Sequence, residues 1–165
     1  MPSCITVSLS RQANDLQENS PMEKLSAQIY CLRNLQNHIV SQALSDLKLS
    51  YTQALLLCKL SEMPGRSATQ KALRGYLQIQ SATISTILTG LKQREFVQLT
   101  TDPSDSRGNL ISLTPRAIAL IPRLSACLDA VDQKTAADLS EKEMAVFTAL
   151  LQRMQSNLEA KEPHP

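Results

Sequence analysis

Apolar positions recur every three or four residues over most of the chain, the spacing that places side chains on one face of an α-helix. A Ser or Thr stands at the start of most of these runs, where its side chain can cap the first backbone N–H groups. The pattern therefore predicts six helices, running approximately over residues 20–47, 50–62, 67–76 and 81–94 and from residues 114 and 140 onwards.

One segment departs from the helical pattern. Phe96 to Thr101 and Leu110 to Thr114 are short β-prone runs, and the Asp, Pro, Ser, Gly and Asn residues between them favour a turn. Arg107 lies in this loop. A lone hairpin directly after two short helices is the layout of a winged helix-turn-helix, a mainly α fold with a small β-hairpin wing. DNA is therefore the first partner that the sequence indicates.

The distribution of charge supports this interpretation more than the total does. The 165 residues carry a net charge of +2, but the segment from Arg66 to Arg123 holds eight basic and three acidic residues. A localised positive face is typical of a module that binds phosphates. A chance excess of charge on a solvated surface would give the same count. With three Tyr, two Phe and no Trp, the chain is poor in rings on which single-stranded bases could stack.

Several other classes of protein find little support. The four cysteines are far apart and form no CxxC pair, so neither a zinc site nor a disulfide framework is expected. His38 and His164 are too separated for a catalytic dyad or metal cluster, and no Gly-rich phosphate loop or nucleophile elbow is present. There is no run of about 18 apolar residues and no signal peptide. We expect a cytoplasmic protein without cofactor, membrane segment or enzymatic activity.

The segments 67–76 and 81–94 are joined by about four residues, as in a helix-turn-helix. On the second, apolar residues gather on one face, which must be buried. The opposite face is small and uncharged, and its Ser, Thr and Gln side chains can hydrogen-bond base edges in the major groove. An ordinary amphipathic helix would show the same polar face, but the hairpin that follows favours the DNA-reading interpretation. The exposed face comprises Ala82, Ser85, Thr86, Thr89 and Gln93.

These features resemble the MarR family of bacterial transcriptional regulators over nearly the whole chain, from Ser20 to Leu158. The segment 49–53 resembles the start of the family's second helix, and the spacing of residues 73–91 follows its helix-turn-helix. Asp105-Ser106-Arg107 before Leu110 to Thr114 resembles its wing. The resemblance implies a homodimer on a pseudo-palindromic operator in double-stranded DNA. It also implies that Arg107 enters the minor groove and that Asp105 holds the wing or neighbouring basic groups.

The resulting division of the chain has a flexible tail (1–19), a helical dimerisation region (20–48 and 115–160) and a winged helix-turn-helix (49–114). The candidate DNA contacts lie on the wing, on the reading helix and on basic side chains beside it. They are Arg107, Asp105, Ser81, Ala82, Ser85, Thr86, Thr89, Lys71, Arg74, Lys92 and Arg94.

Two departures from the family pattern affect the expected mode of binding. Members usually carry an arginine where Thr86 stands and an Asp-Arg pair where Thr89-Gly90 stands, so no bidentate arginine–guanine contact is available from residues 81–91. A family glycine before the wing is Glu95 here. We expect specificity to rest on the wing, on groove shape and on A·T-rich sequence. The alternative is a winged-helix interaction module with weak or no base readout.

The resemblance further implies an effector, either a small aromatic acid or an oxidant. Cys31 and Cys127 are the candidate redox sensors, because the helices that carry them are expected near the dimer interface. A plain structural role is the simpler interpretation of each cysteine, since no neighbouring residue would stabilise a thiolate.

Overall fold

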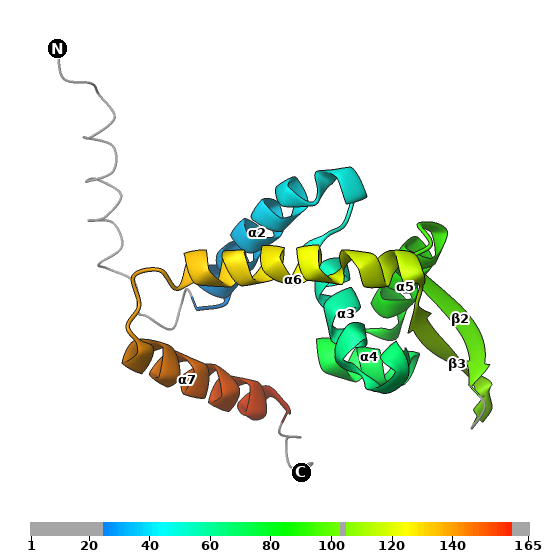
Figure 1. Ribbon diagram of the computed structural model, residues 1–165. Coiled ribbons are helices and arrows are strands. Elements are labelled where there is room, and N and C mark those ends of the chain that lie inside the picture. The colour runs from blue at the N-terminus through cyan, green and yellow to red at the C-terminus, as the bar shows by residue number, and fades with distance from the viewer. Residues whose placement is uncertain (1–24, 103–104, 160–165) are drawn as a thin grey trace, which may run out of the picture. The chain divides into compact units, whose positions relative to one another are not determined.

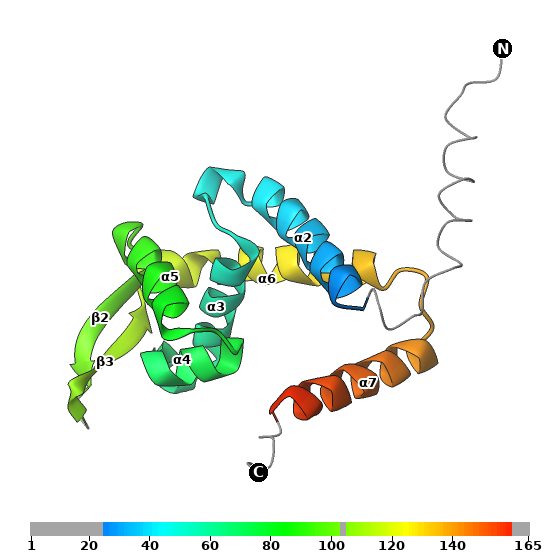
Figure 2. The same ribbon diagram turned by 180° about the vertical axis from the view of Figure 1, so that it is seen from behind.

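The computed structural model describes residues 25–102 and 105–159, with side chains omitted at residues 102 and 105–108. Contacts divide the chain into two compact units, residues 1–51 and 52–165. Figures 1 and 2 show the elements of both units from opposite sides.

The described residues of the first unit form the long helix α2 (Leu25–Ala43) and the 3-10 turn η1 (Ser45–Leu47). The helix predicted to reach about residue 47 therefore ends four residues early, and its predicted start at residues 20–24 lies outside the described residues. After Ala43 the bonding changes to the i+3 pattern, with Lys48 N donating to Ser45 O at 3.2 Å. Lys48 is left-handed, with φ of 52°, which ends the turn.

Helix α3 (Tyr51–Glu62) leads into the second unit, which continues with the 3-10 turn η2 (Pro64–Arg66), α4 (Gln70–Leu77) and α5 (Ser81–Gln93). Helix α3 buries more side chains than α4 or α5, namely Ala54, Leu56, Leu57 and Leu60. Helix α4 packs against α5, and α5 packs against strand β2 (Val97–Asp102). The predicted helices over 50–62 and 81–94 are thus confirmed to within a residue at each end.

A three-stranded antiparallel sheet has the order β1-β3-β2, where β1 is Ser67–Thr69 and β3 is Asp105–Leu113. Strands β2 and β3 form the predicted hairpin, with Leu99 opposite Ile111. The prediction that residues 67–69 begin a helix was wrong. Ala68 pairs with Ile111 in the sheet, and both are buried. This pairing depends on residues about 40 positions away, so local sequence could not reveal it.

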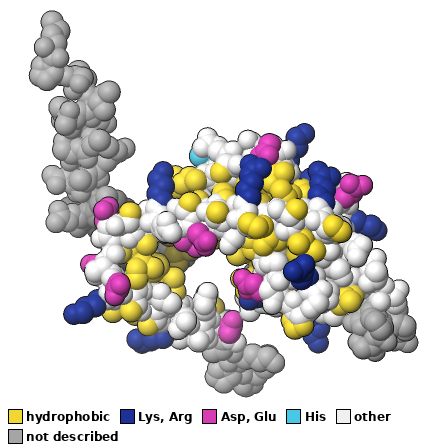
Figure 3. Space-filling model, in the orientation of Figure 1, with side chains coloured by type: hydrophobic (Ala, Val, Ile, Leu, Met, Phe, Trp, Pro, Cys, Tyr) yellow, Lys and Arg dark blue, Asp and Glu magenta, His cyan; other side chains and the backbone are white. Residues whose placement is uncertain are grey.

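The unit ends with α6 (Pro115–Thr135) and α7 (Glu141–Glu159). Both predicted starts are confirmed by their caps. Thr114 Oγ1 accepts from Ala117 N at 3.2 Å, and Ser140 with Glu143 forms a reciprocal capping box. No residue of α7 is buried. Figure 3 shows hydrophobic side chains gathered on the surface of α7. The exposed apolar residues of this helix include Val146, Phe147 and Leu150.

None of the described helices combines the length and apolar character needed to cross a membrane.

Candidate nucleic-acid interface

Helices α4 and α5 meet through a short turn with fixed geometry. Gln78 is left-handed, with φ of 51°, and its N–H donates to the carbonyls of Arg74 and Gly75 at the end of α4. At the other end of α4, Thr69 caps the helix by accepting from Ala72 N at 3.2 Å. Leu73 and Ile84 are fully buried. Together these features hold α5 at a defined angle to α4, as a helix-turn-helix requires.

The exposed face of α5 is the one that the sequence predicted. Ile84, Leu88 and Leu91 are buried, whereas Ser81, Ala82, Ser85, Thr86 and Thr89 are exposed. Three hydroxyl groups on this face donate back to the carbonyl four residues earlier: Ser85 to Ser81 at 2.9 Å, Thr86 to Ala82 at 3.1 Å and Thr89 to Ser85 at 2.9 Å. Their protons are therefore engaged within the helix.

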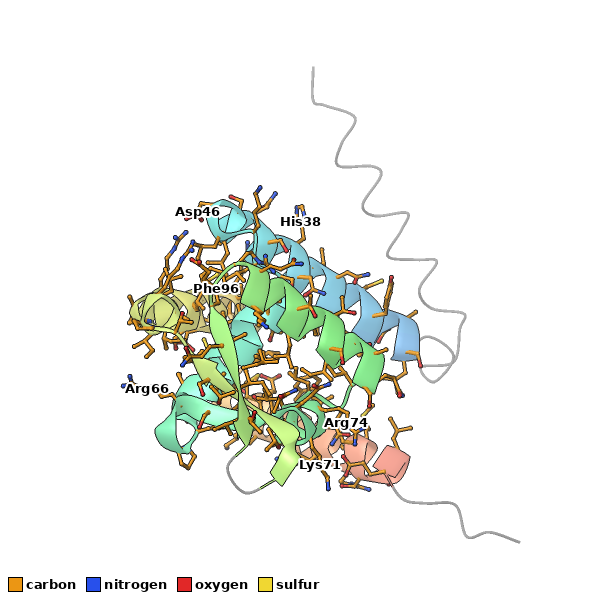
Figure 4. All side chains as sticks on the ribbon, turned by 90° about the vertical axis from the view of Figure 1, so that its right-hand side faces the viewer. His38, Asp46, Arg66, Lys71, Arg74 and Phe96 are labelled. Carbon is orange, nitrogen blue, oxygen red and sulfur yellow. The ribbon has the colours of Figure 1, made fainter. Side chains whose placement is uncertain are left out.

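Two side chains of α4 bind hydroxyl groups of α5. Gln70 Nε2 donates to Ser85 Oγ at 2.9 Å, and Arg74 Nη1 donates to Ser81 Oγ at 2.8 Å. Figure 4 shows Lys71 and Arg74 on α4, beside the N-terminal end of α5. Gln70 was missing from the sequence-based set, because its role depends on a partner fifteen residues away. The only signal in the sequence was that Gln70 lies one helical turn before Arg74 and would therefore share its face of α4.

The predicted basic residues do not share one environment. Lys71 and Lys92 are exposed, as is Arg74. Arg94 is half-buried and folds back on α5, where its Nε donates to Gly90 O at 2.9 Å. A Cβ atom at position 90 would lie 3.2 Å from Arg94 Nη2. Gly90 thus leaves room for this arrangement of the arginine.

Glu95 lies at the joint between α5 and the wing in the left-handed conformation, with φ of 60°. Its carboxylate accepts from Arg116 Nη1 at 3.4 Å. Thr114 Oγ1 donates to Glu95 O at 2.7 Å, so the joint is also tied to the start of α6. The ion pair is well exposed on both sides and contributes little to stability. The position therefore keeps the backbone geometry of a glycine while carrying a negative charge.

Replacing Glu95 with glycine is expected to raise the free energy of unfolding by about 0.5–1 kcal/mol, because glycine adopts a positive φ without steric strain. Glu95→Gln provides the matched control, since it removes the charge but keeps the strain. Urea denaturation of both variants checks this expectation. Equal stabilisation by the two variants would mean that charge, and not backbone strain, limits stability at this position.

The wing tip carries the two residues to which the family resemblance assigns the main roles in DNA binding. Asp105 and Arg107 belong to β3, which pairs with β2 from Val97↔Leu113 to Thr101↔Asn109. Their side chains lie outside the described part of the chain. Both assignments remain predictions from the sequence.

The described cysteines differ in environment. Cys31 is exposed, whereas Cys58 and Cys127 are half-buried. Burial raises the pKa of Cys58 to about 11, with further increases from the charges of Glu62, Asp129 and Cys127. Burial also raises the pKa of the Cys127 thiol, although Arg123 opposes the effect. Since the thiolate is the reactive form, this environment disfavours oxidation at Cys127.

A helix-turn-helix followed by an antiparallel hairpin defines the winged helix-turn-helix class. Residues 49–108 match the model described as the MarR family. This match agrees with the family resemblance that the sequence indicated.

The chain is similar to known regulators over most of its length. It is 29% identical over 140 residues to the HTH-type transcriptional repressor NicR of Pseudomonas putida, a match that covers 83% of this chain and 87% of the repressor. Among solved structures, the Staphylococcus aureus MepR–DNA complex aligns with a TM-score of 0.75 and 24% identity, covering 81% and 97% of the two chains. Sco3205 of Streptomyces coelicolor in complex with DNA aligns with a TM-score of 0.76 and 20% identity, covering 88% and 92%. These likenesses confirm the winged-helix fold.

Proposed function

We propose that this chain is a MarR-family regulator that binds double-stranded DNA as a homodimer on a pseudo-palindromic operator. The observation that carries the proposal is the exposed, small and uncharged face of α5, held in place by α4. Exposed Lys71 and Lys92 supply positive charge beside it. Solved complexes of MepR and Sco3205 with DNA, proteins similar to this chain, support the choice of partner.

A second copy of the chain is the proposed occupant of the apolar surfaces on α2 and α7. Exposed apolar side chains on α2 include Ile29, Leu32 and Leu35, and α7 exposes Val146, Phe147 and Leu150. Contiguous apolar surface of this kind on a soluble protein marks an association site. Two-fold pairing would repeat the α5 face for half-sites about 34 Å apart on DNA. Under this proposal residues 20–48 and 115–160 dimerise and residues 49–114 read DNA.

Replacing Phe147 with glutamate is expected to weaken self-association at least about thirtyfold, since burying a charge in an apolar contact costs about 2 kcal/mol or more. Phe147 is 44% exposed in the single chain. Sedimentation velocity over a range of concentrations measures the change. Gln152→Glu adds the same charge to the same helix, but about 140° around it from residue 147, and should leave association unchanged. If both variants self-associated as strongly as the wild type, α7 would not form part of the dimer contact.

DNA binding itself is tested by selecting bound sequences from random duplex DNA. Recovery of a two-fold symmetric sequence would support both the partner and the homodimer. Affinity for the recovered duplex should fall steeply as salt rises, because phosphate contacts release counterions. No enrichment, together with no binding to random duplex at low salt, would contradict the proposal.

The second candidate is an interaction module that keeps the winged fold without base readout. It is favoured by the lack of charge on residues 81–91 and by Glu95 at the base of the wing. This candidate predicts no affinity for DNA at low salt, so the same titration separates the two functions.

We further propose that a small aromatic acid or an oxidant tunes DNA binding by changing the distance between the two α5 helices of the homodimer. Of the two candidate sensors, Cys31 is the exposed thiol, whereas burial raises the pKa of Cys127. A peroxide titration of operator affinity in the wild type and in Cys31→Ser and Cys127→Ser tests the redox route. Unchanged wild-type affinity would exclude it.

A further inference from the structure

We propose that Thr86 and Thr89 discriminate between base pairs through their methyl groups and hydroxyl oxygens, so that α5 selects thymine methyls and the amino group of adenine. This inference rests on the proposed DNA binding and specifies how the α5 face would read a sequence. It concerns the chemistry of individual side chains and not the general placement of a helix in the major groove.

The two threonines point in the same direction, away from the core. Successive residues of a helix are turned by 100°, so Ala82, Thr86 and Thr89 lie within about 60° of one another. The buried Ile84, Leu88 and Leu91 define the opposite face. Ala82, Thr86 and Thr89 are all exposed. They form the outermost line of α5, and a major groove that admits the helix would meet these side chains.

The hydroxyl groups of both threonines are already engaged as donors. Thr86 Oγ1 donates to Ala82 O at 3.1 Å, and Thr89 Oγ1 donates to Ser85 O at 2.9 Å. Each proton is therefore held inside the helix, and the oxygen presents lone pairs next to a methyl group. A surface of acceptors and methyls suits the adenine N6 amino group and the thymine methyl.

Cytosine also offers an amino donor, N4, so the thymine methyl and the guanine acceptors are what distinguish A·T from G·C pairs here. Guanine offers two acceptors, O6 and N7, in the major groove, and these need donors. Residues 81–91 contain no charged side chain, and the hydroxyl donors of Ser85, Thr86 and Thr89 are engaged within α5. A guanine facing Thr86 and Thr89 would lose the water bound to O6 and N7 without gaining a hydrogen-bond donor, which costs free energy.

The serines of α5 differ from the threonines in their partners. Ser85 Oγ donates to Ser81 O and also accepts from Gln70 Nε2, while Ser81 Oγ accepts from Arg74 Nη1. The two serines thus connect α5 to α4. Gln70 therefore positions α5 against α4, and Thr86 and Thr89 are the residues that would contact the bases.

The test uses the duplex recovered by selection, with each thymine replaced in turn by deoxyuridine. This change removes only the 5-methyl group and leaves base pairing intact. In the wild type we expect a threefold to tenfold loss of affinity at one or two positions in each half-site. Thr86→Ser or Thr89→Ser should abolish the loss at its own position, whereas Thr86→Val, which keeps the methyls, should retain it. Thr135→Ser, which alters a threonine with the same type of back-bond at the end of α6, should change nothing.

The proposal is overturned if no deoxyuridine costs more than about twofold, or if the serine variants keep the wild-type losses. In that case the wild type still binds the selected duplex, and the proposed DNA binding stands. If selection recovers nothing and the protein does not bind duplex at low salt, both proposals fail together. Denaturation midpoints of the threonine variants should match the wild type, so a lost effect cannot be attributed to unfolding.

Discussion

Replacing Phe96 with alanine is expected to lower the free energy of unfolding by about 3–5 kcal/mol, a large fraction of the stability of a typical domain. Phe96 is 1% exposed and is among the largest fully buried side chains in the described part of the chain. Figure 4 places it beside the C-terminal end of α5. Its ring also carries the Arg116 guanidinium 5.1 Å from its centroid, a contact that adds about 0.5–1 kcal/mol at an exposed site.

The cost would come from the missing ring and not from broken backbone bonds. Phe96 N donates to Leu91 O at 2.9 Å and Phe96 O accepts from Thr114 N at 3.2 Å, and alanine can keep both. Chemical denaturation at a fixed protein concentration measures the change, because dimerisation would make stability depend on concentration. Gln152→Ala is the control, since this exposed side chain lies on α7 away from Phe147 and should change stability by less than about 0.5 kcal/mol. A loss below about 1 kcal/mol for Phe96→Ala would show that the joint between α5 and the wing is not a core element.

Replacing Arg107 with alanine is expected to weaken operator binding at least about tenfold, corresponding to about 1–3 kcal/mol. The reason is the lack of charge on residues 81–91, so that under the proposed function the wing would supply the main arginine contact. The slope of log affinity against log salt should also fall by about 1, because one cation that displaces counterions is lost. Fluorescence anisotropy with the selected duplex at several salt concentrations measures both quantities.

Lys134→Ala removes the same charge from the exposed last turn of α6 and serves as the control for Arg107→Ala. Its affinity should stay close to that of the wild type. If Arg107→Ala preserved both affinity and sequence preference, the wing would not carry the main contact. Thr86 and Thr89 would then have to account for specificity by themselves.

Local sequence predicted several elements because their signals lie within a few residues. The capping Ser140 and Glu143 are three positions apart, and Thr114 caps the helix that it precedes. The spacing of Ile84, Leu88 and Leu91 likewise fixed the buried face of α5. The hairpin was predictable because turn-forming residues separate two β-prone runs. These interactions close short loops, and their residue types are specific to them.

Other features depended on partners distant in sequence. Ser67–Thr69 became a strand because Ala68 pairs with Ile111, and this long-range pairing overrode the helical signal of the segment. The pairing of Glu95 with Arg116, 21 positions later, arose because the first turn of α6 lies next to the joint.

The sequence by itself thus determined the order of helices, the hairpin, the uncharged face of α5 and the family resemblance, because each depends on residue type and short-range spacing. Only the tertiary structure decided which hydroxyl groups of that face also bind side chains of α4. The contact from Gln70 to Ser85 and the one from Arg74 to Ser81 form only when α4 and α5 are packed together. Their geometry, and with it the distinction between the serines and the threonines of α5, follows from helix packing that no local pattern encodes.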